Sequence, residues 1–334
     1  NLPNTLYRNN GDGTFTDVSA ETGIAKYLGK GMGVAIADYD HDGFVDIFVA
    51  NDNHPNFLFH NLGGKKFEEV ALESGVAYAQ SGSALSGMGV DFKDVDNDGR
   101  PDLWHTAVEN ESFPLFRNTG GGQFVEQTLP AQLAVTRSMS GWGNGIVDFD
   151  NDGWKDLFVA RSNVLDNIAQ FSNRKYEEPN SVLRNLGNGK FQDVSSQAGA
   201  DFQVAAPHRG VAFGDMDNDG RIDAIVTVLN GPLQYFHNIS KNNNHWTILT
   251  LVGKRSNRMG LGAQVRITGE DGKVQYNEAT TAVGYACSSD SRVHFGLGGS
   301  RVIREIEITW PGGARQLLRD VPADQILKIE ETVQ

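Results

Sequence analysis

The sequence predicts an all-β fold: a β-propeller of four-stranded blades over residues 1–240 and a small β-sandwich-like domain over residues 241–334. Three observations support this prediction. The chain has 39 glycines among 334 residues, which is typical of many short strands joined by tight turns. An Asp-rich motif recurs four times, and a second motif recurs between its copies. The flanking segments are short, apolar and rich in residues that favour strands.

The first motif reads D-x-D-x-D-G-x-x-D over nine residues. Its copies begin at Asp38, Asp94, Asp148 and Asp215. A glycine stands five positions before each first aspartate, at Gly33, Gly89, Gly143 and Gly210. Short apolar segments lie on both sides of every copy, so each copy is predicted to be a loop between two strands.

The second motif is an apolar or aromatic pair followed by Arg or His and then Asn. Its copies end at Asn9, Asn61, Asn118, Asn185 and Asn238. In the first four copies a Phe follows six residues later, after a glycine-containing turn, at Phe15, Phe67, Phe124 and Phe191. Each unit therefore reads as strand, Asp loop, strand, connection, strand, Gly turn, strand. Four strands in about 55 residues match one propeller blade.

The flanking strands separate these loops from EF-hands. An EF-hand loop requires helices on both sides and a bidentate Glu at position 12. Position 12 is Val49, His105, Val159 and Val226 in the four copies. We therefore exclude an EF-hand.

The motif is well suited to bind Ca²⁺, which takes six to eight oxygen ligands in flexible geometry. Aspartates at positions 1, 3 and 5 of a tight loop can point at one centre, and Gly at position 6 permits the backbone reversal. The carbonyl of position 7 and the aspartate of position 9 would complete the shell. The predicted ligands are Asp38, Asp40, Asp42, Phe44 and Asp46; Asp94, Asp96, Asp98, Arg100 and Asp102; Asp148, Asp150, Asp152, Trp154 and Asp156; and Asp215, Asp217, Asp219, Arg221 and Asp223.

The Asp motif has two other possible interpretations, a solvated turn and a magnesium site. An Asp-Gly sequence alone is a common solvated hairpin turn. Four carboxylates converging without a cation would repel one another, however, and the pattern occurs four times. Magnesium is the second choice of metal because it demands a tighter octahedral shell and usually keeps several waters. We expect about four calcium ions.

Together the two motifs resemble the FG-GAP/VCBS repeat family over residues 1 to about 239. The remainder resembles the ASPIC/UnbV domain, a pairing found in the cartilage acidic protein family and its bacterial relatives. The residues that carry this second resemblance are Asn244-His-Trp246, Ser256-Asn-Arg258, Gly260-Leu-Gly262-Ala, Gly284-Tyr285, Ser288-Ser-Asp290, Val293-His-Phe-Gly-Leu-Gly298 and Trp310-Pro-Gly-Gly313. The resemblance implies a propeller with calcium loops at blade hairpins in an extracellular or periplasmic protein.

The C-terminal segment also has strand features of its own. Ile306-Glu-Ile308-Thr-Trp310 alternates as a half-buried strand, because successive side chains of a strand point to opposite faces. Pro311-Gly312 suits the middle of a type II turn. Several similar strands predict a small β-sandwich.

The chain opens at the second motif, inside a blade, and the last unit also ends on that motif. A four-bladed ring could close by combining N- and C-terminal strands in one blade. The interpretation that we favour is that an N-terminal portion is missing, because relatives usually have more blades.

The main functional hypothesis is a binding, adhesion or scaffold protein with structural calcium and a protein or glycan ligand, in a larger extracellular or periplasmic assembly. Recognition would use the connections at residues 51–55, 109–113 and 161–180, since loops on rigid β-scaffolds carry recognition. The net charge of −13 argues against nucleic acid, which needs clustered Lys and Arg. The sequence has no run of about 18 or more apolar residues, so we expect no transmembrane helix.

The alternative is a carbohydrate-active enzyme of the lyase or dehydratase type built on the same repeats. His54, His105 and His208 could lie near one end of the ring and act as bases or metal ligands. The sequence contains no nucleophile motif or phosphate-binding loop, and the sixteen loop aspartates are assigned to calcium. We therefore expect no catalytic residues and favour the binding protein.

Overall fold

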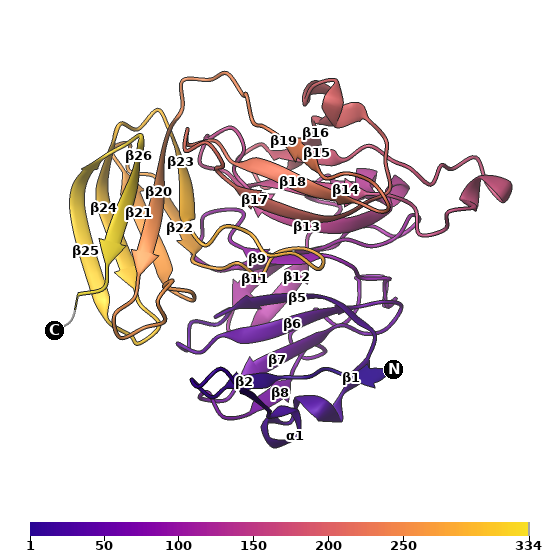
Figure 1. The fold of residues 1–334 in the computed structure, drawn as a ribbon, viewed down its shortest axis with the longest axis horizontal. Helices are drawn as coiled ribbons and strands as arrows, with labels where there is room; N and C mark the ends of the chain where they lie inside the picture. The colour runs from indigo at the N-terminus through magenta and orange to yellow at the C-terminus, as the bar shows by residue number, and fades with distance from the viewer. Residues whose placement is uncertain (333–334) are drawn as a thin grey trace.

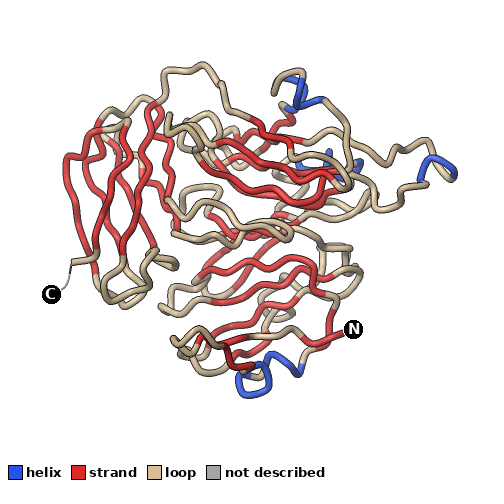
Figure 2. Tube along the Cα trace, viewed as in Figure 1, coloured by secondary structure: helices blue, strands red, loops and turns tan. Residues whose placement is uncertain are grey.

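The computed structural model describes residues 1–332 and shows an all-β molecule in two parts. A row of antiparallel sheets, the blades, packs side by side, and a two-sheet sandwich lies against one side of this row (Figure 1). Helices in the described residues are short, with three to six residues each (Figure 2). The predicted all-β class is confirmed.

The blades follow the order of the repeat, and each strand pairs with the next one along the chain. Blade 1 consists of β5 (Gly31–Ala37), β6 (Asp46–Asn51), β7 (Phe57–Asn61) and β8 (Phe67–Glu69). Blade 2 consists of β9 (Val90–Lys93), β10 (Asp102–His105), β11 (Leu115–Gly120) and β12 (Gln123–Glu126). Blade 3 consists of β13 (Gly141–Val147), β14 (Asp156–Arg161), β15 (Ser181–Asn185) and β16 (Phe191–Asp193). Blade 4 has β17 (His208–Gly214), β18 (Asp223–Val228) and β19 (Gln234–Phe236).

Each motif occupies the place that the sequence predicts. The Asp loop joins the first two strands of a blade; in blade 1, Ala37 pairs with Asp46 across it. The second motif lies at the end of the third strand, which contains the asparagine in blades 1 to 3 and ends just before it in blade 4. In blade 1 a Gly turn then leads to the fourth strand, where Asn61 faces Phe67. The recurring motifs, their short apolar flanks and the turn glycines therefore located the strands of these blades.

The glycine that precedes each Asp loop lets neighbouring blades approach. A Cβ on Gly33 would collide with the carbonyl of Met88 in blade 2, and a Cβ on Gly89 would collide with that of Trp142 in blade 3. On Gly143 it would lie 2.7 Å from the carbonyl of Arg209 in blade 4. The first strands β5, β9, β13 and β17 thus form the line along which the blades pack.

The N-terminal residues form two small sheets of their own. Strand β2 (Tyr7–Asn9) pairs with β3 (Phe15–Asp17), and β1 (Leu2–Pro3) pairs with β4 (Leu28–Gly29). The short helices α1 (Ser19–Thr22) and η1 (Ile24–Lys26) lie between these pairs. Over residues 1–332, β19 is the outer strand of blade 4 and does not pair with β2. The blade of mixed N- and C-terminal strands, one of the two expected arrangements, is therefore not formed.

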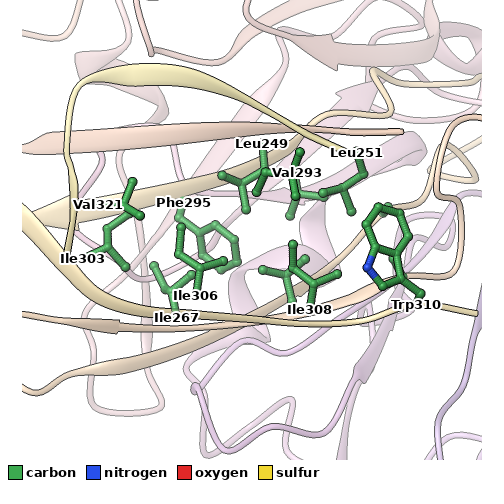
Figure 3. Packing of buried hydrophobic residues seen from close by; sticks show 14 of the residues in the cluster. Leu249, Leu251, Ile267, Val293, Phe295, Ile303, Ile306, Ile308, Trp310 and Val321 are labelled. Atoms are coloured by element: carbon green, nitrogen blue, oxygen red, sulfur yellow. The ribbon is translucent and has the colours of Figure 1, made fainter. Parts of the chain in front are cut away.

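The predicted β-sandwich is confirmed over the C-terminal residues. One sheet has the order β23–β20–β26 and the other β22–β21–β24–β25. Their bounds are β20 (His245–Val252), β21 (Gln264–Gly269), β22 (Val274–Glu278), β23 (Val293–Gly298), β24 (Val302–Thr309), β25 (Arg315–Pro322) and β26 (Gln325–Glu330). Figure 3 shows Leu249 and Phe295 of the first sheet facing Ile306 and Ile308 of the second in one apolar core.

One local prediction for the sandwich is wrong. The hairpin between β24 and β25 turns at Pro311 and Gly312, but the residue in the left-handed conformation is Gly313, with φ 80°. A type II turn requires that conformation at Gly312. The chain instead uses a three-residue hairpin with a left-handed glycine at its end, closed by the Trp310 N–H donating to the Ala314 carbonyl at 2.8 Å.

A segment of the sandwich domain also packs against the blades. The chain between β22 and β23 leaves the sandwich and runs over β9 (Figure 1), where Val90 and Gly284 exchange backbone hydrogen bonds of 3.4 and 2.9 Å. A Cβ on Gly210 would lie 3.0 Å from the carbonyl of Tyr285. Residues 283–287 therefore take the place against blade 4 that a following blade takes against each earlier one.

Candidate metal centres

Four Asp loops, numbered 1 to 4 from Asp38, Asp94, Asp148 and Asp215, have the same backbone shape. Position 4 is left-handed in every loop: His41, Asn97, Asn151 and Asn218 have φ of 63°, 59°, 59° and 62°. Position 6 is also left-handed: Gly43, Gly99, Gly153 and Gly220 have φ of 90°, 93°, 89° and 85°. The predicted reversal at glycine is confirmed. Asn at position 4 suits this conformation because its short polar side chain tolerates it.

Hydrogen bonds to carboxylates hold each loop closed. In loop 1, Asp38 accepts from the N–H of Asp42 at 3.1 Å and of Gly43 at 3.0 Å. Asp42 accepts from the N–H of Phe44 at 2.8 Å. The equivalent bonds of the first and fifth positions recur in loops 2 to 4. The loop is therefore preorganised with its carboxylates turned inward.

The asparagine of the second motif links neighbouring loops. Its N–H donates to the position 9 aspartate of its own blade at 2.7–2.8 Å in all four blades. Its side-chain amide donates to the position 8 carbonyl of the same loop. In blade 2 the amide of Asn118 also reaches the Tyr39 carbonyl in loop 1 at 2.8 Å. Asn185 and Asn238 make the same bond to the preceding loop.

The structure brings some predicted ligands together and leaves others apart. The carboxylates of positions 1, 3 and 9 lie within 4.8 Å of one another in loops 1 to 3, and those of Asp217 and Asp223 do so with His237 in loop 4. The position 5 aspartate Asp42 joins Asp40 and His60. Asp98 and Asp219 instead pair with the arginine at position 7. The position 7 carbonyls remain a prediction.

Burial makes these carboxylates costly to ionise. It raises the pKa of Asp148 to about 8, with further increases from Asp152 and Asp150 nearby. Burial likewise raises the pKa of Asp102 and Asp156 well above its usual range and that of Asp46 to about 7. A divalent cation among these oxygens would stabilise the ionised form, because an opposite charge within a few ångströms favours it. The several acidic clusters can therefore hold metal ions.

The residue before the motif asparagine completes each cluster, and sequence reasoning missed its role. It is Arg in blades 2 and 3, where Arg184 contacts Asp150 at 2.7 Å and Asp152 at 3.0 Å. It is His in blades 1 and 4, where His60 Nδ1 lies 3.3 Å from Asp46 Oδ1. The signal was present as the third position of the second motif, which is always Arg or His.

The sandwich covers the Asp loops. Gln264 Nε2 donates to Asp38 Oδ2 of loop 1 at 3.1 Å, and Lys155 of loop 3 reaches the Tyr276 carbonyl at 2.9 Å. Arg292 donates to the Asp215 carbonyl of loop 4 at 2.7 Å. Gly220 lies so close to Trp246 that a Cβ would collide with its ring. The loops thus lie between the two parts of the molecule.

The three histidines of the enzyme alternative do not form one cluster with the loops. His105 lies between the rings of Phe48 and Phe116 in the blade core, and burial lowers its pKa to about 4. His208 is buried and shares a 2.7 Å hydrogen bond with Gln234. His54 Nδ1 lies 3.2 Å from the Pro55 carbonyl.

The repeats and the sandwich define a blade-repeat protein with acidic loop clusters that could hold metal ions, and sequence comparison identifies the same two parts. The FG-GAP-like repeat family matches residues 2–49, 38–105 and 164–226, and the ASPIC and UnbV family matches residues 253–334. The chain belongs to the FG-GAP-like repeat family and carries an ASPIC/UnbV domain.

Its relatives include cartilage acidic protein 1. The human protein is 26% identical over 332 residues, which cover 94% of this chain and 46% of the relative. The Xenopus tropicalis protein is 30% identical over 200 residues, which cover 57% of this chain and 30% of the relative. The chain thus spans about half or less of the length of these relatives.

Two solved structures show weaker likeness. An Agrocybe aegerita lectin that recognises non-reducing terminal N-acetylglucosamine is 15% identical with a TM-score of 0.42, covering 96% of this chain and 89% of the lectin. The V. cholerae biofilm matrix protein Bap1 is 11% identical with a TM-score of 0.35, covering 96% and 58%. In the part of the chain that the structure describes, no helix has the length and apolar character needed to span a membrane.

Proposed function

We propose that this chain is a secreted or periplasmic scaffold in which calcium at the four Asp loops braces the blades and fixes the sandwich. The main support for this proposal is that all four loops share one preorganised geometry and lie between the two parts of the molecule. The expected ligands are the sixteen aspartates and four position 7 carbonyls predicted from the motif.

The donor set fits calcium. Carboxylate and carbonyl oxygens are hard ligands, and a loop that alternates aspartates can supply the six to eight that Ca²⁺ requires. Burial, and then the neighbouring Asp152 and Asp150, raise the pKa of Asp148 to about 8, and a bound cation would oppose this shift by favouring the ionised form. Calcium would supply the positive charge and cross-link the carboxylates of positions 1, 3 and 9.

A structural role follows from the repetition. A catalytic ion needs an open coordination position and a nearby base at one site. Here the four loops repeat the same bonds, and the asparagines link each loop to its neighbour. The calcium of one blade would therefore support the next, as expected of a brace.

Recognition of a protein or glycan partner would fall to the connections far from the loops. The connection between β14 and β15 extends away from the blades (Figure 1). It contains the short helix η3 (Ile168–Gln170) and exposes Phe171, which is 72% accessible, with Val164 and Leu165. We assign partner contact to this connection because it is long, projects from a rigid β-scaffold and carries three exposed apolar side chains.

The calcium assignment is tested by comparing loaded and EGTA-treated protein. Calcium that binds only the native state stabilises it by about 2.7 kcal/mol per site at a hundredfold excess over Kd. Elemental analysis should find about four calcium ions per chain, and EGTA should lower the melting temperature strongly. Equal melting temperatures together with no bound calcium would overturn the proposal. Magnesium at equal concentration is the control and should restore much less stability.

A further inference from the structure

The four Asp loops are of two chemical kinds, distinguished by the residue before the motif asparagine. Loops 2 and 3 face Arg117 and Arg184, whereas loops 1 and 4 face His60 and His237. A guanidinium stays protonated and has no free lone pair, so it cannot ligate a metal. A neutral imidazole can, and it is a common ligand of transition metals.

The imidazole of His60 points into loop 1. Its Nδ1 lies 3.3 Å from Asp46 Oδ1 and 3.5 Å from Asp40 Oδ2. This nitrogen is inaccessible to solvent and has no hydrogen-bond partner of good geometry among the described residues. The ring packs edge-on against Tyr39, with centroids 6.1 Å apart. Ligand atoms of Asp40, Asp42 and His60 lie within 4.8 Å of one another.

Loop 4 repeats the arrangement from the far end of the row of blades. His237 Nδ1 lies 3.2 Å from Asp223 Oδ1, and its Nε2 lies 3.8 Å from Asp217 Oδ2. The Tyr235 hydroxyl, 3.3 Å from Nδ1, also contacts Asp223. Ligand atoms of Asp217, Asp223 and His237 again lie within 4.8 Å of one another.

The arginine loops provide an internal contrast. The guanidinium of Arg117 contacts Asp96, Asp98 and Asp102, and that of Arg184 contacts Asp150 and Asp152. In these loops the same position contributes a fixed positive charge and no ligand. Two loops on one chain therefore offer oxygen only, and two offer oxygen with one nitrogen.

We propose that loops 1 and 4 are mixed nitrogen–oxygen centres that accept a first-row divalent ion of the Zn²⁺ type as well as Ca²⁺. This inference rests on the proposed function only in assuming that the loops bind divalent cations. Imidazole suits Zn²⁺ and its neighbours in the row, whereas carboxylate and carbonyl oxygens suit Ca²⁺ and Mg²⁺. The arginine loops would accept hard cations alone.

The test is calorimetric titration of calcium-free protein with Zn²⁺, with calcium stoichiometry measured in parallel. His60→Asn should remove one zinc site, and H60N/H237N should remove two. Each affected loop should lose tenfold or more in zinc affinity while its calcium binding is retained. Arg117→His is the matched gain-of-site variant. It places an imidazole at the equivalent position of loop 2 and should add one zinc site.

The outcomes separate the two proposals. Equal zinc stoichiometry and affinity in the native protein and H60N/H237N, with four calcium ions retained, would overturn this inference alone. Absence of calcium binding in all variants would overturn the proposed function. If H60N fails to fold by circular dichroism, Arg117→His decides: no added zinc site means that this position does not ligate, and His60 only orients Asp46.

Discussion

At the scale of single residues, the asparagine of the second motif is a structural link whose importance the loop pattern hides. Asn118 is 1% exposed, and its amide serves the Tyr39 carbonyl at 2.8 Å and the Pro101 carbonyl at 3.2 Å. These carbonyls belong to loops 1 and 2. One side chain therefore joins two Asp loops, and the same bond recurs along the row.

Asn118→Ala should destabilise the protein because it removes the amide donor of the buried Tyr39 carbonyl and of the part-buried Pro101 carbonyl. Each unsatisfied buried group costs about 1–3 kcal/mol, so the urea midpoint should fall clearly. The control is Asn9→Ala at the same motif position. Asn9 is exposed and bonds only within its own turn, so that variant should unfold like the native protein. Equal loss in both variants would contradict the role of the inter-loop bond.

Asp150→Ala should change stability in opposite directions with and without calcium. With calcium it removes a ligand of loop 3, and the melting temperature should fall by several degrees. Burial and Asp152 raise the pKa of Asp150, so its negative charge costs free energy in the folded state when no cation is bound. In EGTA the substitution should therefore be neutral or stabilising. Paired melts in both buffers, with the exposed Asp12→Ala as control, measure this reversal; a constant difference would argue against a cation there.

At the scale of elements, the connection between β14 and β15 is separable from the fold. Its base is anchored where Asn163 N–H and Ser162 Oγ both donate to the Tyr176 carbonyl at 2.9 Å. Beyond this base the chain is mostly exposed. A loop with a firm base and an exposed tip tolerates replacement of the tip.

Replacing residues 164–175 by a short Gly-Ser turn should preserve folding and calcium content and weaken partner binding. The melting temperature and elemental analysis test the first part. A pull-down from native extract tests the second, with Phe171→Ser as the minimal variant. The binding role of this connection is wrong if both variants retain every partner of the native protein.

At the scale of the whole molecule, the row of blades and the sandwich share the Asp loops as their contact. The blades could be located from the sequence because their two motifs recur at regular spacing, and the sandwich because residues 306–310 alternate as a strand and the segment resembles a known domain. Sequence reasoning missed the contact because Gln264 and Asp38 lie far apart in the chain. The turn at Gly313 was missed for a related reason: Pro-Gly-Gly permits more than one turn type, and strand register selects among them. The boundary at residue 240 stays a prediction.

Calcium removal should loosen the sandwich from the blades before either unfolds. In EGTA, repulsion among the carboxylates should disturb the loops that contact Gln264, Tyr276 and Arg292. Hydrogen exchange should therefore rise at these residues and at residues 283–287, while the sandwich core around Ile306 stays protected. Uniform exchange changes across the chain would indicate global destabilisation instead.

Residues 283–287, which pack against Gly210, restrict where further repeats can be added to the row of blades. Repeat arrays need terminal units that differ from the interior ones, and residues 283–287 fill that role beside blade 4 by occupying the face that another blade would need. A repeat duplicated after β19 would displace this segment and separate the sandwich from loop 4. Duplication within the interior of the row would keep the terminus intact. Gene lineages of this architecture should therefore vary in repeat number upstream of the last blade and keep the junction between that blade and the C-terminal domain unchanged.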